Sequence, residues 1–114
     1  MKNREIITLM HKLSHGRIGP SGDWVRVFND REELDEGKFN KLLKDAIQSD
    51  IVLIYQSSIN VTEANASEAY KIVAEYVKHG IVKLADPRFK SQVEIDPLGI
   101  GAKYRTNKAI NSDA

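Results

Sequence analysis

The second half of the chain carries basic and polar side chains whose types suit contacts with phosphates and base edges. Lysine and arginine neutralise phosphates, and short polar side chains hydrogen-bond to bases. Each candidate contact residue carries either a positive charge or a neutral hydrogen-bond donor. They are Asn65, Ser67, Lys71, Lys83, Arg88, Lys90, Lys103 and Arg105. Their chemistry is that of a surface for double-stranded nucleic acid.

Two predicted elements must position most of these residues. The first is a helix at 63–79, with Thr62 as its N-cap and Gly80 as its stop signal. The second is a β-hairpin, because residues 81–85 and 92–96 alternate in polarity around a charged turn. The apolar stripe of the helix recurs at helical spacing and consists of Ala66, Ala69, Tyr70, Val73, Tyr76 and Val77.

The remaining segments carry weaker patterns. In chain order we predict a helix at 3–14, a loop at 15–22, a strand at 24–28, a helix from 29 or 30 that breaks at Gly37, and a helix at 38–48. Residues 50–55 stay open, because a short apolar run fits either a buried strand or a short helix that precedes a recognition helix. Residues 99–114 are polar and without periodicity, so a basic, mobile tail is expected there.

The block from Asn60 to Pro97 runs through a polar turn, a helix, the segment 78–82 (KHGIV) and a hairpin. This order resembles the second half of a winged helix-turn-helix domain, in which a recognition helix leads into a wing. The resemblance implies a single α+β domain over residues 1–98, with the wing at 81–95. It further implies a DNA-binding protein without catalytic activity, which binds as a homodimer on repeated half-sites.

The predicted recognition helix departs from a basic pattern, because Glu63, Glu68 and Glu75 oppose Lys71 and Lys78. Carboxylates repel phosphates, so the wing is expected to contribute more to DNA affinity than the helix. The layout is similar to that of small relaxosome accessory proteins of Gram-positive conjugative plasmids. This similarity implies an accessory or regulatory protein of a mobile element, acting in plasmid transfer, origin recognition or transcription control. A DNA-processing protein would be a further partner.

Composition narrows the class of protein. The chain has 114 residues, of which 41% are hydrophobic and 29% charged, enough for one domain with its own core. It contains no cysteine, which excludes disulfides, thiolate zinc sites and cysteine nucleophiles. The sequence shows neither an apolar run of about 18 residues nor a signal-peptide pattern, so a cytoplasmic protein without membrane contact is expected.

Charge is unevenly distributed, although the formal net charge is only +1. Residues 1–20 carry four basic and one acidic side chain (net +3), 21–36 carry two and six (net −4), and 80–114 carry six and four (net +2). The acidic middle supports a first alternative, a protein-interaction or inhibitor module that uses residues 30–36. Its carboxylates are Asp30, Glu32, Glu33, Asp35 and Glu36.

A weaker alternative is a small α/β ligand-binding domain, with 24–28, 51–55 and 81–85 as strands of one sheet joined by helical crossovers. Pairing of 81–85 with 92–96 would exclude it. Two short motifs are too incomplete to predict a site. His11 and His15 share a helical face without a further ligand, and the glycines after residue 98 lack the Ser or Thr of a phosphate loop. We therefore expect no catalytic residue, no cofactor and no metal.

Overall fold

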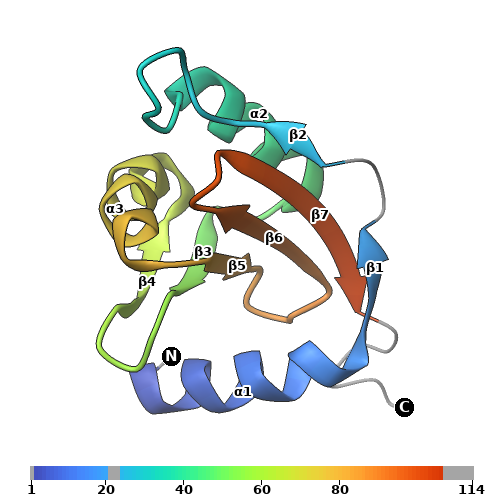
Figure 1. Cartoon of the computed structure of the whole chain (residues 1–114). Helices are drawn as coiled ribbons and strands as arrows, with labels where there is room; N and C mark the ends of the chain where they lie inside the picture. The colour runs from blue at the N-terminus through green and yellow to red at the C-terminus, as the bar shows by residue number, and fades with distance from the viewer. Residues whose placement is uncertain (1, 21–23, 107–114) are drawn as a thin grey trace.

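The computed structural model describes the backbone of residues 2–20 and 24–106, and the side chains of residues 2–11 and 24–104. Its elements follow one another as Figure 1 shows. They are α1 (Asn3–Gly16), β1 (Arg17–Pro20), β2 (Val25–Arg26), α2 (Glu36–Ala46), β3 (Ile51–Tyr55), β4 (Val61–Asn65), the short 3₁₀ helix η1 (Ala66–Glu68), α3 (Ala69–Tyr76), a second 3₁₀ helix η2 (Val77–His79), β5 (Val82–Ala85), β6 (Ser91–Asp96) and β7 (Ile100–Thr106).

The strands form one antiparallel sheet in the order β1-β7-β6-β5-β3-β4, and β2 also pairs with β7. β3 and β4 form a hairpin, and β5, β6 and β7 form a meander. α3 carries the chain from β4 past β3 to β5, because β3 lies between those two strands in the sheet. The fold is therefore α+β, as predicted, with an antiparallel sheet at its centre.

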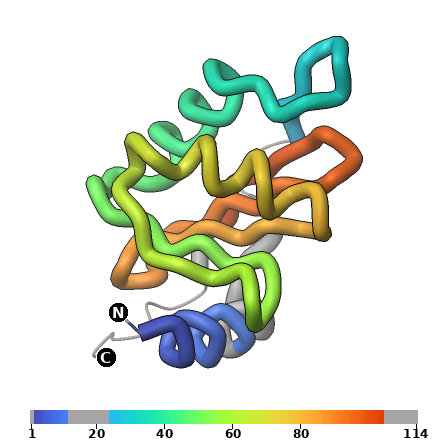
Figure 2. Tube along the Cα trace, turned by 90° about the vertical axis from the view of Figure 1, so that its left-hand side faces the viewer, coloured from blue at the N-terminus to red at the C-terminus, as the bar shows by residue number. Residues whose placement is uncertain are grey.

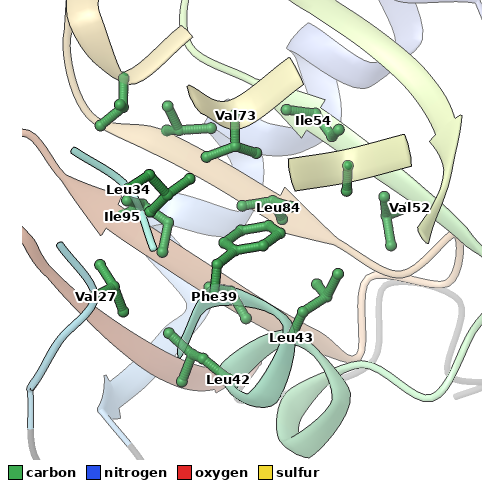
Figure 3. Close-up of a cluster of buried hydrophobic side chains, with 14 of the residues drawn as sticks. Val27, Leu34, Phe39, Leu42, Leu43, Val52, Ile54, Val73, Leu84 and Ile95 are labelled. Atoms are coloured by element: carbon green, nitrogen blue, oxygen red, sulfur yellow. The ribbon is translucent and has the colours of Figure 1, made fainter. Parts of the chain in front are cut away.

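One face of the sheet is covered by α2 and α3. Figure 3 shows Phe39 of α2 in the middle of this core, with Val73 of α3 and Leu84 of β5 around it. All three side chains are fully buried, so this core removes a large apolar area from water and stabilises the packing of both helices. The Phe39 ring also contacts the ring of Tyr70, with centroids 6.3 Å apart.

The opposite face is covered by α1, which lies across the sheet from α2 and α3 (Figure 1). Ile6 and Met10, one helical turn apart, pack on Leu53 and Val61 of the β3–β4 hairpin. Phe89, from the turn between β5 and β6, completes this second core and is 1% exposed. The turn of the predicted wing is thus tied to the interior.

Several sequence predictions are confirmed. The helix expected at 3–14 is α1, the helix expected at 38–48 is α2, and residues 81–85 pair with 92–96 as β5 and β6. α2 begins at Glu36 because the side chain of Asp35 accepts a hydrogen bond from the backbone N–H of Lys38 at 2.9 Å. Because β5 pairs with β3 and β6 in antiparallel fashion, the parallel sheet expected for the α/β alternative is wrong.

The winged helix-turn-helix is not confirmed, because the segment before α3 is extended. Residues 51–55, which the sequence left open, are the strand β3 and pair along their whole length with β4. The predicted helix at 63–79 is wrong in its first turn, where 61–65 belong to β4. Helical structure starts at Ala66, and Thr62 therefore caps no helix. Pairing with β3 satisfies the backbone of this segment in the sheet instead.

Two further predictions are wrong. The helix expected from residue 29 is a turn, in which the Asn29 side chain accepts hydrogen bonds from the backbone N–H groups of Arg31 and Glu33, at 2.8 and 3.1 Å. The tail expected from residue 99 begins within the sheet, since residues 100–106 form β7 and pair with β6. Residues 107–114 of that predicted tail lie outside the described residues.

Candidate nucleic-acid interface

The beginning of the α3 segment and the tip of the β5–β6 hairpin lie at the same end of the sheet. The backbone N–H of Ala66 donates to the carbonyl oxygen of Asp50 at 2.7 Å, which fixes η1 beside the start of β3. Leu53 pairs with Ala85, so β5 also ends beside the start of β3. Figure 2 shows the hairpin tip, the end of α2 and the beginning of the α3 segment together on its left-hand side.

Two surface hollows connect these segments across the α2–β3 connection. A hollow of about 560 Å³ is lined by Lys44 and Ser67, together with Gln48 and Ser49. A second hollow of about 240 Å³ is lined by the same Gln48 and Ser49 and by Lys90 of the hairpin tip. Gln48 and Ser49 thus lie between the beginning of the α3 segment and the hairpin tip, so one extended ligand can contact both segments.

We call this surface the tip edge. It consists of Lys44, Gln48, Ser49, Asn65, Ser67, Lys71, Arg88 and Lys90. Apart from half-buried Ser49, all its side chains are exposed. Lys71 follows Ser67 by four residues, which places it one turn further along the same side of the helical segment.

The hairpin tip is a rigid turn. The Asp86 carboxylate accepts from the backbone N–H groups of Lys90 and Ser91, at 2.8 and 2.9 Å, and from that of Arg88 at 3.3 Å. Phe89 has a φ of 57°, in the left-handed region, and its ring is held in the α1 core. A conformation that a bulky residue rarely adopts is thus imposed by burial of its own side chain. Arg88 and Lys90, which flank Phe89, are presented outward at fixed positions.

The structure separates two of the predicted contact residues, Lys83 and Lys103, from the tip edge. Lys83 pairs with Tyr55 and Glu94 on the face covered by α1. Lys103 lies on the α2 side of β7, where it lines a hollow with Lys38 and Lys41. The backbone of Arg105 pairs with Ser91 next to the hairpin tip, but its side chain lies outside the described residues.

The contribution of α2 to the basic surface was not predicted from the sequence. Lys38, Lys41 and Lys44 follow one another at three-residue spacing, a basic stripe opposite the apolar side chains of the same helix. This spacing was visible in the sequence and could have indicated the stripe. The position of Gln48 beside the hairpin could not have been found there, because it depends on how α2 packs on the sheet.

The charge of the tip edge is mixed. Lys44, Lys71, Arg88 and Lys90 are exposed cations, and Asp50 and Glu68 are exposed carboxylates nearby. The Asp86 carboxylate is used within the turn. The edge therefore has a modest positive balance, which suits contact with a phosphate backbone and predicts an affinity that falls as salt rises.

Titratable groups elsewhere do not contribute to this edge. Burial raises the pKa of the Tyr76 phenol, at the far end of α3, so that group stays protonated at neutral pH. Within the described residues, no group of three or more His, Asp or Glu side chains is placed to hold a metal ion. No helix among them is both long and apolar enough to span a membrane.

Comparison with known proteins adds no relative: no family model, no curated protein and no solved structure matches the chain. Fold and site define an α+β domain with an antiparallel sheet and, at one end, a hairpin whose tip carries Arg88 and Lys90.

Proposed function

We propose that this protein binds double-stranded DNA through the tip edge, without catalysing a reaction. The observation that carries the proposal is that the α3 segment begins beside the hairpin tip. Gln48 and Ser49 lie between the two and line a hollow toward each of them. A helix end and a neighbouring two-stranded loop are a pair that can enter a major groove and follow the adjoining phosphates. The short polar side chains would face base edges, and the lysines and the arginine would face phosphates.

The rigidity of the tip supports the proposal. The backbone of Arg88 and Lys90 is held by a turn that is anchored at Asp86 and Phe89, so the loss of freedom on contact with phosphates is confined to the side chains. We extend the proposal to the role that the resemblance implies, an accessory or regulatory protein of a mobile element. A homodimer would double the phosphate contacts on repeated half-sites.

The first prediction concerns the hairpin cations. Arg88→Ala combined with Lys90→Ala should weaken binding to a random-sequence duplex of about 30 base pairs by roughly tenfold or more. Because each phosphate contact contributes about 0.9 to the slope of log K against log salt, the slope should become shallower by about 1.8. Fluorescence anisotropy titrations at two or more salt concentrations measure both quantities.

The matched control is Arg31→Ala with Lys78→Ala. It removes the same charge at the opposite end of the sheet, around a groove near Pro97. This control should lose little affinity, since screening weakens the influence of distant exposed charges. Equal losses for the two pairs would indicate a diffuse charge effect and contradict the tip edge. An unchanged affinity for the Arg88 and Lys90 variant would contradict it directly.

A second candidate function is supported by a different observation. Glu32 and Glu33 of the turn line a groove of about 570 Å³ together with Glu75 of α3, over an apolar floor that includes Phe28. The turn is joined to α3 by the Tyr70 hydroxyl, which donates to the carbonyl oxygen of Leu34 at 3.0 Å. This acidic groove would bind a basic segment of a protein partner, as expected for an interaction or inhibitor module.

Charge reversal separates the two candidate functions. Glu32→Lys with Glu33→Lys should leave DNA affinity within about threefold or raise it, because it adds positive charge far from the tip edge. The same variant should abolish binding of a basic protein partner, by reversing the complementarity. Anisotropy with the duplex and capture of partners by wild type and variant measure the two effects. A loss of DNA binding in this variant would contradict the assignment of DNA to the tip edge.

A further inference from the structure

A third hollow, separate from the tip edge, gathers positive charge between α2 and the strands β2 and β7. Its volume is about 340 Å³. Its cations are Arg26 of β2, Lys38 and Lys41 of α2, and Lys103 of β7, and its one carboxylate belongs to Asp45. Four positive charges and one negative charge give the lining a net charge of +3. None of these residues belongs to the tip edge.

The other described hollows lack this surplus of positive charge. The two at the tip edge each combine a single lysine with a single aspartate, and the groove near Pro97 is acidic. Like charges placed around one concave surface repel one another, and the low-dielectric walls strengthen the field inside. The concentration of cations therefore favours a bound anion, although the ion pair of Arg26 with Glu32 offsets one of the positive charges.

Arg26 is partly engaged at the rim of this hollow. Its guanidinium donates to the carbonyl oxygen of Asn29 at 3.2 Å and lies 3.5 Å from a carboxylate oxygen of Glu32. These contacts hold the guanidinium of Arg26 against the turn that carries Asn29 and Glu32. Lys38, Lys41 and Lys103 carry the other positive charges of the lining.

The hollow also has an apolar part. Val25 and Leu42 contribute to its lining, and Val25 is 43% exposed. Trp24, the residue before Val25, is 40% exposed and packs edge-on against the Tyr104 ring, with centroids 6.4 Å apart. Because Leu42 is buried, an inorganic anion would leave the exposed Val25 side chain in water, whereas a ligand with an organic part would cover it.

We propose that this hollow binds a small phosphomonoester, with its phosphate among Lys38, Lys41 and Lys103 and its organic part against Val25 and Leu42. A volume of about 340 Å³ lies in the range of small-molecule sites and fits a ligand of the size of a mononucleotide. A dianionic phosphate would offset much of the surplus charge, and the lysine ammonium groups would donate to its oxygens. The proposal is independent of DNA binding at the tip edge.

Trp24 provides one readout, because it is the chain's one tryptophan and directly precedes Val25, which lines the hollow. We would titrate the whole protein with adenosine monophosphate, adenosine and inorganic phosphate, and follow tryptophan fluorescence and heat of binding. Adenosine monophosphate should bind at least tenfold more tightly than either of its parts. Adenosine binding as tightly as the nucleotide would overturn the role of the lysines, and phosphate binding as tightly would overturn that of Val25 and Leu42.

Variants locate the binding. Lys38→Ala with Lys41→Ala should weaken nucleotide binding at least tenfold. Lys2→Ala with Arg4→Ala, exposed at the beginning of α1 on the other face of the sheet, should leave it unchanged. Asp45→Asn should tighten it severalfold by removing the repelling carboxylate. Arg88→Ala with Lys90→Ala should leave it unchanged, which separates this site from the tip edge. Equal binding by the Lys38 and Lys41 variant and the wild type would overturn the proposal.

Discussion

Phe89→Ala is expected to lower the free energy of unfolding by about 3–5 kcal/mol, the typical range for removing a fully buried phenylalanine ring. The ring is 1% exposed and fills the core between α1 and the sheet, against Ile6, Met10 and Leu53 among others. Alanine and phenylalanine both tolerate a φ of 57° poorly, so the backbone cost changes little between them. The loss therefore reports the packing of the ring.

Urea denaturation followed by circular dichroism measures this loss. Phe89→Leu is the control, because it keeps much of the apolar volume and should cost clearly less. DNA affinity, measured at a temperature where both variants are folded, should fall more in Phe89→Ala, since the anchor of Arg88 and Lys90 is gone. A loss of stability below about 1 kcal/mol would show that the tip is not held by this ring.

Charge reversal at the hairpin tip should have the largest effect on binding. Arg88→Glu with Lys90→Glu converts two attractive contacts with phosphates into two repulsive ones, so we expect the duplex affinity to fall at least about a hundredfold at low salt. Both side chains are exposed, and the turn is held by the side chain of Asp86 and the ring of Phe89 rather than by the substituted residues. The free energy of unfolding should therefore change little.

Arg31→Glu with Lys78→Glu is the matched control, with the same change in net charge at the opposite end of the sheet. Anisotropy at low and high salt distinguishes the two pairs, because the difference between them should shrink as salt screens the charges. A reversal at the tip that binds DNA as well as the wild type would exclude the tip edge as the interface. The acidic groove would then be the stronger candidate for the functional surface.

Local patterns predicted the elements whose signal lies within their own residues. The apolar spacing of α1 and α2 recurs every three or four residues, because one face of each helix packs on the sheet. The hairpin of β5 and β6 was predicted from alternation on both sides of a short charged turn. Of the candidate contact residues, those in the hairpin tip and at the start of the α3 segment lie together at the tip edge.

Elements whose conformation depends on pairing with another strand were not predictable from their own residues. Residues 61–65 resemble the start of a helix in sequence, but β3 provides hydrogen-bond partners for an extended backbone. Residues 100–106 lack an evident pattern on their own, yet β6 pairs with them and buries Ala102 and Tyr104. Strand pairing satisfies backbone groups through a partner outside the segment itself, here the neighbouring strand of a hairpin, and these contacts override weak local preference.

The sequence by itself therefore determined the α+β class, the hairpin with its charged tip, and the residue types available for an interface. Only the tertiary structure decided that Gln48 and Ser49 stand between Ser67 and Lys90, and that Lys103 joins the lysines of α2 instead of the hairpin. The physical reason is that composition and periodicity are properties of neighbours in the chain. Which side chains share a surface depends on strand order and helix packing, and these follow from burying both faces of one sheet.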